Sequence, residues 1–179
     1  KYYLFYIGFM LFMIAAAYLL GSLNSAIIVS RVLYRDDIRK HGSGNAGLTN
    51  TLRTYGAKAA GLTLLGDVLK TVFAILFAAV LFGFNYVGGI SIGDGFCYVA
   101  GLFAVIGHIF PVYYGFKGGK GVATTAVVIL CTSPITFLIL LACFVIIVLG
   151  SILPWAPVVI ILLSIPSAIV RFYYRRKMF

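Results

Sequence analysis

Long apolar stretches separated by short polar segments make up most of this chain. About 20 apolar residues are needed to cross the hydrocarbon core of a bilayer as a helix. The pattern therefore predicts an all-α polytopic membrane protein with five transmembrane helices, at residues 4–30, 57–84, 96–114, 122–149 and 158–172. Pro134 lies inside the fourth stretch, which is either one kinked helix or two short ones. The last stretch is short for a span unless it begins near Ile152.

The composition strengthens this prediction. Hydrophobic residues make up 63% of the 179 positions, and the mean hydropathy is +1.10, whereas soluble domains are about half apolar. We therefore expect residues 1–179 to form one integral membrane domain with no soluble domain of useful size. Cys97, Cys131 and Cys143 lie in apolar stretches without ligand spacing, and we expect them to be small buried hydrophobic residues.

The charges are strongly unequal. The chain has 14 Lys and Arg residues, no Glu, and four acidic residues, which are Asp36, Asp37, Asp67 and Asp94. A basic excess can indicate nucleic acid, anionic lipid head groups or an anionic substrate. In a membrane protein, part of it reflects the preference of basic loops for the cytoplasm.

The basic residues alternate between sides of the predicted membrane. They gather in 31–58, in 115–121 and in the tail "RFYYRRKMF", whereas 85–95 and 150–157 contain none. This predicts an N-terminus outside and a C-terminus in the cytoplasm. Splitting the fourth stretch at Pro134 would break the alternation unless one half is re-entrant. Both glycine-rich loops then lie on the cytoplasmic face, where they can converge on one anionic substrate.

The first glycine-rich loop contains Gly42-x-Gly44-x-x-Gly47, the glycine pattern of a dinucleotide-binding turn. That fingerprint requires a preceding strand, a following helix and an acidic residue about 20 positions further on. Here the polar segment "RDDIRK" precedes it, and the acidic residue would be Asp67, inside a predicted span. The context does not fit a dinucleotide-binding turn, so the glycine pattern alone is weak evidence for one.

The same loop has the residues of an anion site. Glycines let successive N–H groups form an anion-binding nest, and Arg53 adds a planar fork suited to phosphate. Uncharged donors come from Ser43, Asn45, Thr49 and Asn50. The structural alternative is a glycine-rich turn that caps the next helix.

The second loop, "FKGGKGVAT", is not a nucleotide P-loop, because one residue is missing between Gly115 and Lys120. It still places charge and free N–H groups ahead of a helix N-terminus, where phosphate binds well. Its candidate ligands are Lys117, Gly118, Gly119, Lys120 and Gly121. The alternative is a basic turn that contacts only lipid phosphate.

Three ionisable residues lie inside predicted spans. His108 is near the end of the third span and close to the second loop, and either packing or a role at that face fits it. Asp67 and Lys70 are three residues apart on one helix, where they can form an ion pair. A functional and a structural pair are equally consistent with the sequence.

The motifs "GSGNAGLTNTLR" and "GHIFPVYYGFKGGKGVAT" resemble those of the bacterial acyl-phosphate:glycerol-3-phosphate acyltransferases, the PlsY family. "GSLNSA" and "GDVLK" are also similar to that family, and the resemblance covers about residues 18–134. It implies a bacterial inner-membrane enzyme of phospholipid synthesis. Such an enzyme transfers a fatty acyl group from acyl phosphate to glycerol 3-phosphate, giving lysophosphatidic acid and phosphate, without a metal or other cofactor. Its partners would be these substrates and membrane lipids, not nucleic acid or nucleotide.

The resemblance also implies roles for single residues. The catalytic candidates are Ser43, Arg53, His108 and Lys120. The candidates for holding substrate phosphate are Gly42, Gly44, Asn45, Gly47, Thr49, Asn50, Lys117, Gly118, Gly119 and Gly121. Because the chain has no Glu and few Asp, a carboxylate base is poorly supported. His108 is the candidate base, and the alternative is that a substrate phosphate oxygen takes the proton.

The C-terminal part departs from the family. The family ends in a His-Arg-Glu-Asn motif, which a chain without Glu cannot contain, and only Ser151 lies where the family has two serines. We therefore expect residues 150–179 to be divergent or truncated. The family has seven helices where five are counted here. An inactive homologue that binds phosphate or lipid is the alternative function. A small organic-phosphate transporter is disfavoured because the charges gather on one face.

Overall fold

The structure is a computed structural model, and it describes residues 2–82, 86–87 and 90–149. The chain divides into two compact units, Lys1–Val128 and Ile129–Phe179. The first unit contains both glycine-rich loops. The predicted span at 158–172, the break at 150–157 and the basic tail lie outside the described residues.

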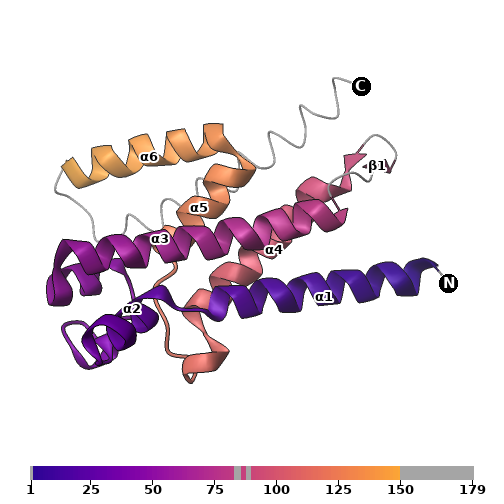
Figure 1. The fold of residues 1–179 in the computed structure, drawn as a ribbon. Coiled ribbons are helices and arrows are strands. Elements are labelled where there is room, and N and C mark those ends of the chain that lie inside the picture. Colours follow the sequence, from indigo (N-terminus) through magenta and orange to yellow (C-terminus); the bar gives the residue numbers. More distant parts are fainter. Residues whose placement is uncertain (1, 83–85, 88–89, 150–179) are drawn as a thin grey trace. The chain divides into compact units, whose positions relative to one another are not determined.

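The described elements are almost all helices, as predicted (Figure 1). They are α1 (Tyr2–Ser22), α2 (Ser25–Tyr34), η1 (Ile38–Lys40), α3 (Leu48–Phe82), α4 (Ile92–Ile109), η2 (Val112–Tyr114), α5 (Val122–Thr132) and α6 (Pro134–Leu149). The exception is a small antiparallel hairpin of β1 (Tyr86–Val87) and β2 (Ile90–Ser91), which pairs Tyr86 with Ser91 and Val87 with Ile90. The sequence had predicted only a loop there.

The first predicted span is two helices, so the expectation of one continuous helix over 4–30 was wrong. The chain leaves the helix after Ser22, and α1 and α2 meet at a bend of 40°. The side chain of Asn24 accepts a hydrogen bond from the N–H of Ile27 and caps the start of α2. The polar patch at 21–25 therefore breaks the span because its side chains compete for backbone hydrogen bonds.

The basic segment predicted between the first two spans is also partly helical. Helix α2 runs on to Tyr34, and α3 begins at Leu48. Within α3, Gly56 has φ 83° and ψ −177°, so it separates a short helix at 48–55 from the long one at 57–82. Glycine adopts such a conformation without steric cost. The kink falls where the sequence placed the start of the second span, but residues 48–55 on the loop side are helical.

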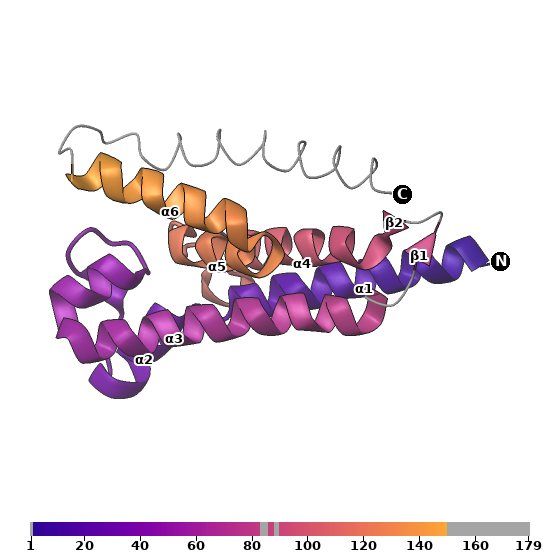
Figure 2. The same cartoon turned by 90° about the horizontal axis from the view of Figure 1, so that it is seen from above.

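Helices α1, the long part of α3, and α4 lie side by side (Figures 1 and 2). Their shared core consists of Met13, Ala17, Ala74, Ala78, Phe82, Ala100 and Ala104. Small residues bring the backbones of α1 and α4 close together. A Cβ at Gly21 would lie 2.1 Å from the carbonyl oxygen of Ala104, and a Cβ at Gly107 would lie 2.3 Å from that of Tyr18. Small residues allow such close helix packing within membranes.

This close approach gives the first prediction. We expect Gly21→Ala to lower the free energy of unfolding by about 2 kcal/mol or more, because the added methyl meets backbone that cannot rotate away. Gly8 lies on the same helix with nothing within 4 Å of its Cβ position. The matched variant Gly8→Ala should change stability by less than about 1 kcal/mol. Thermal unfolding in detergent measures both, and equal stability of the two variants would contradict the packing.

Among the described residues, two helices are long and apolar enough to span a membrane, Leu48–Phe82 and Gly95–Tyr114. The bent pair of α1 and α2 makes a third if it is one span. The stretch at 122–149 forms two helices, divided between Thr132 and Pro134. With 11 residues, α5 is about 17 Å long, too short to cross alone.

The three cysteines are free thiols, but they are not buried as expected. Cys97 and Cys143 are half-buried, and Cys131 is exposed. Apolar side chains on the outside of a membrane protein contact lipid, so an apolar stretch does not by itself place its cysteines in the core.

Candidate functional site

The two glycine-rich loops meet, as the sequence predicted. The N–H of Ala46 in the first loop donates to the carbonyl oxygen of Gly118 in the second at 3.4 Å. The side-chain amide of Asn24 donates to the carbonyl oxygen of Ala46 at 3.2 Å. The bend between α1 and α2 thus holds the first loop, which in turn holds the second. The end of α4 holds the second loop as well, because the N–H groups of Gly118 and Gly119 donate to the carbonyls of Ile109 and His108.

Arg39 joins the two loops a second time. Its Nη1 donates to the carbonyl oxygens of Tyr114 at 2.8 Å and Lys117 at 3.4 Å. The guanidinium is oriented by Asp37, through Nη2 to Oδ2 at 2.7 Å and Nε to Oδ1 at 2.9 Å. This pairing lowers the pKa of the Asp37 carboxyl and raises the pKa of Arg39. Sequence reasoning counted Arg39 only as a cytoplasmic charge and missed this role, although the Asp37-x-Arg39 spacing was visible.

The ion pair between Asp37 and Arg39 predicts that the stability of the protein falls in acid. Because the pKa of Asp37 is lower in the folded protein, its stabilisation is present above the ordinary carboxyl pKa of 3.8 and is lost as the pH falls below it. We expect Asp37→Asn to lower the melting temperature at neutral pH and to flatten its dependence on pH below about 4. Melting curves across this range measure both effects. If the melting temperature of Asp37→Asn depends on pH as that of the unsubstituted protein does, the stabilising role of the Asp37–Arg39 ion pair is contradicted.

Asn50 organises the first loop from within. It is buried, and its Nδ2 donates to the carbonyl oxygens of His41 at 2.9 Å, Asn45 at 3.0 Å and Ile38 at 3.2 Å. Its Oδ1 accepts from the N–H of Ser43 at 3.1 Å. Both ends of the amide are therefore occupied by the loop backbone. The sequence predicted that Asn50 binds phosphate, whereas these contacts show that its amide holds the backbone of the loop in shape.

Exchanging the side-chain amide of Asn50 for a carboxyl group should destabilise the loop strongly. Asn50→Asp replaces a donor that faces three carbonyls by an acceptor, and we expect a loss of about 1–3 kcal/mol in stability. The matched control is Asn45→Asp. Asn45 is only half-buried, and its amide makes no hydrogen bond to the described part of the chain, so this change should cost less than about 0.5 kcal/mol. Chemical unfolding of both variants tests the difference.

Five polar or charged candidates of the two loops lie on the surface, whereas Gly47, Gly119 and Gly121 are buried. Ser43, Thr49, Arg53, Lys117 and Lys120 are exposed. Thr49 and Arg53 are four residues apart on the short helix before Gly56, and so share a face. Gly42, Gly44 and Gly121 have positive φ, as a nest-like turn requires.

The cations of this surface are not neutralised within the described part of the chain. Asp36 contacts His41 and Tyr55, Asp37 pairs with Arg39, and Asp67 pairs with Lys70. No described acidic side chain pairs with Arg53, Lys117 or Lys120. The loops therefore present an excess of positive charge with glycine backbone between, which suits a phosphate.

A buried polar cluster lies beside the loops. The predicted pair is confirmed, since Nζ of Lys70 is 2.8 Å from Oδ1 of Asp67. His108 joins it, which the sequence did not show, with its Nδ1 2.9 Å from Nζ of Lys70. The side chains of Asp67, Lys70 and His108 are 2%, 5% and 4% exposed. A buried ion pair of this kind is strongly coupled to the surrounding fold.

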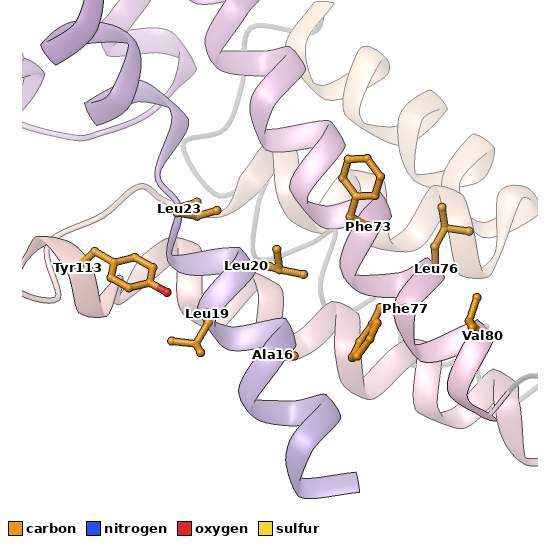
Figure 3. Close-up of a pocket in the computed structure, with 9 residues that line it drawn as sticks. All are labelled: Ala16, Leu19, Leu20, Leu23, Phe73, Leu76, Phe77, Val80 and Tyr113. Carbon is orange, nitrogen blue, oxygen red and sulfur yellow. The ribbon is translucent and has the colours of Figure 1, made fainter. Parts of the chain in front are cut away.

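An apolar groove of about 680 Å³ runs between α1 and α3 (Figure 3). Its lining residues are Ala16, Leu19, Leu20, Leu23, Phe73, Leu76, Phe77, Val80 and Tyr113. The Tyr113 hydroxyl is the polar side-chain group in this lining. The groove suits hydrocarbon and offers no charge to a phosphate.

Comparisons with known proteins agree with these observations. The family model for glycerol-3-phosphate acyltransferase matches residues 11–177. The glycerol-3-phosphate acyltransferase of Neisseria meningitidis serogroup C (strain 053442) is 48% identical over 126 residues, which are 70% of this chain and 60% of that protein. The protein of the same name from Mycoplasmopsis agalactiae is 48% identical over 134 residues, 73% of this chain and 55% of that protein. The matched region thus spans about 60% of the length of these relatives.

Two solved structures have a similar fold. The glycerol 3-phosphate form of PlsY, an integral membrane glycerol 3-phosphate acyltransferase, aligns with a TM-score of 0.70 and 33% identity, over 92% of this chain and 77% of that one. Its lysophosphatidic acid form aligns with a TM-score of 0.60 and 27% identity, over 94% and 89%. With a family model that matches nearly the whole chain and a fold shared with these structures, this multi-pass membrane protein belongs to the glycerol-3-phosphate acyltransferase family.

Proposed function

We propose that this chain transfers a fatty acyl group from acyl phosphate to glycerol 3-phosphate, giving lysophosphatidic acid and phosphate. The observation that carries the proposal is the junction of the two glycine-rich loops, in or next to which Arg53, Lys117 and Lys120 are exposed and have no acidic partner among the described residues. Both substrates carry phosphate, so two adjoining anion-binding loops have two ligands to hold. The names of the relatives and the two ligand forms of PlsY support this choice.

The chemistry needs positioning more than a strong nucleophile. A hydroxyl oxygen of glycerol 3-phosphate attacks the acyl carbon, the bond from that carbon to the phosphate oxygen breaks, and phosphate leaves with the electron pair. The proton lost by the hydroxyl ends on the released phosphate, so charge and atoms balance. Acyl phosphate is a mixed anhydride with a good leaving group, so orientation and charge stabilisation supply much of the rate.

We assign the direct phosphate contacts to the exposed groups, Ser43, Thr49, Arg53, Lys117 and Lys120. The N–H groups of Gly44, Gly47, Gly118 and Gly119 already donate to backbone carbonyls, so these glycines shape the loops. Asn50 and Arg39 hold the loops in shape. We place the protein in the bacterial inner membrane with both loops in the cytoplasm, where glycerol 3-phosphate is found. Basic loops favour that side.

The test uses purified chain in phospholipid nanodiscs with radiolabelled glycerol 3-phosphate. Palmitoyl phosphate should give labelled lysophosphatidic acid and release orthophosphate in equal amount, whereas palmitoyl-CoA should give none. A product formed from palmitoyl-CoA alone would contradict the donor, and no product from either would contradict the activity.

One observation favours binding without turnover as a second candidate. The chain contains no Glu, so the family's His-Arg-Glu-Asn motif is absent from it. Calorimetry with glycerol 3-phosphate separates the two functions. Saturable binding without acyl transfer would identify a homologue that retains the phosphate loops and lacks the catalytic step.

A further inference from the structure

Lys70 lies between one ion-pair partner and two hydrogen-bond acceptors. A lysine ammonium carries three donors and no acceptor. Nζ of Lys70 contacts three atoms, which are Oδ1 of Asp67 at 2.8 Å, Nδ1 of His108 at 2.9 Å and the carbonyl oxygen of Leu23 at 3.0 Å. Two of the N–H groups therefore have hydrogen-bond acceptors, and the adjacent Asp67 carboxylate forms an ion pair that balances the charge. This geometry is that of a charged lysine.

The contact with Lys70 determines which nitrogen of His108 carries the proton. Because the ammonium can only donate, Nδ1 must offer its lone pair to Nζ. A neutral imidazole with an unprotonated Nδ1 carries its hydrogen on Nε2. Oδ1 of Asp67 lies further from Nδ1, at 3.4 Å, and already faces the ammonium. An imidazolium would place a second positive charge 2.9 Å from Lys70.

The other ring nitrogen faces the junction of the loops. A Cβ built on Gly119 would lie 2.1 Å from Nε2 of His108 and 2.7 Å from the carbonyl oxygen of Ala46. Nε2 therefore lies where the second loop meets the first. Asp67 and Lys70 are the charged side chains that contact the ring within the described residues, and both do so from the Nδ1 side.

We propose that Lys70 holds His108 as the neutral Nε2–H tautomer, which donates a hydrogen bond to a phosphate oxygen bound between the loops. This inference rests on the proposed function and deepens it. His108 is then a donor to the substrate and not the base that the sequence analysis considered. Lys70 and Asp67 act through His108 as positioning residues. The hydroxyl proton goes to an acceptor other than this imidazole.

Nitrogen NMR tests the tautomer without any turnover. The full chain is labelled with ¹⁵N-histidine in nanodiscs, and His41→Gln assigns the His108 signals, since the chain has two histidines. We expect a protonated Nε2 and an unprotonated Nδ1 near neutral pH. A protonated Nδ1, or a ring protonated on both nitrogens, would overturn the inference. An Nε2–H signal from a chain without acyl transfer would leave the tautomer standing and contradict only the proposed activity.

Glycerol 3-phosphate tests the donor role, with calorimetry in parallel to show that it binds. Binding should move the Nε2–H proton signal. Binding that leaves this signal unchanged would show that His108 does not touch the phosphate. In Lys70→Met, His108 should populate both tautomers, which a purely structural lysine would not cause. If that variant does not fold, the spectrum of the unsubstituted chain decides.

Two substitutions of His108 distinguish a donor from a base. Glutamine places an amide N–H near the position of Nε2 but cannot accept a proton at neutral pH, whereas asparagine places its amide near Nδ1. His108→Gln should keep turnover within about 10-fold, and His108→Asn should lose about 100-fold or more. Equal losses of about 100-fold or more in both variants would indicate a base and overturn the donor role.

Discussion

Truncating Arg53 or Lys120 to alanine is expected to lower acyl transfer by at least about 100-fold while leaving the fold intact. Both side chains are exposed and unpaired within the described residues, so their loss removes no packing. Stability should therefore change by less than about 0.5 kcal/mol. The loss falls on catalysis because these charges stabilise the phosphate that gains negative charge as it leaves.

The measurement is orthophosphate release with thermal unfolding on the same samples. Lys58→Ala removes an exposed cation just beyond the Gly56 break and is the matched control for Arg53. Lys40→Ala removes another exposed lysine and is the matched control for Lys120→Ala. Cys97→Ala is the control for a substitution within a helix. Arg53→Lys keeps the charge but not the planar fork, and should recover only part of the activity. Full activity in Arg53→Ala or Lys120→Ala would remove that residue from the site.

Replacing Lys70 with methionine is expected to cost about 3–5 kcal/mol in stability, the largest effect of any single substitution considered. It leaves the Asp67 carboxylate buried beside His108 without a cation, and it removes the donor to Leu23 at the bend between α1 and α2. The prediction concerns the fold, so it holds whether or not the chain has enzymatic activity.

A double substitution separates the lost ion pair from lost volume. Asp67→Leu with Lys70→Met replaces the pair by apolar side chains and should recover part of the stability, because no buried charge remains unpaired. Lys58→Met is the control for adding an apolar side chain at an exposed position. Chemical unfolding gives the three values. A double variant as unstable as Lys70→Met alone would show that Asp67 is not the source of the penalty.

Much of the candidate site was visible in the sequence because its chemistry is local. Glycines, uncharged donors and cations follow one another within 42–53 and within 117–121, so a short window contains most of what a phosphate nest requires. The Asp67–Lys70 pair was predictable for the same reason, since three residues on a helix bring two side chains to one face. His108 could not be added to that pair, because it lies 38 positions further along the chain.

The helix boundaries were less predictable where polar groups compete for the backbone. Hydropathy predicted the positions of the spans, but it did not predict the bend at Asn24 or the short helix at 48–55. Both depend on particular hydrogen bonds and dihedral angles, which an average over many residues does not record. The division before Pro134 was left open by the sequence and was decided by the structure.

The sequence by itself determined that this is a helical membrane protein with two basic, glycine-rich loops of the glycerol-3-phosphate acyltransferase type. Hydrophobicity and loop chemistry add up along the chain and need no partner distant in sequence. Only the tertiary structure decided which groups remain available for a ligand. In the structure, Asn50 and Arg39 hold the loops by hydrogen bonds to their backbone, and Lys70 contacts His108. The contacts of Arg39 and of Lys70 join segments that are distant in sequence and that the packing of α1, α3 and α4 brings together, so the sequence alone does not show them.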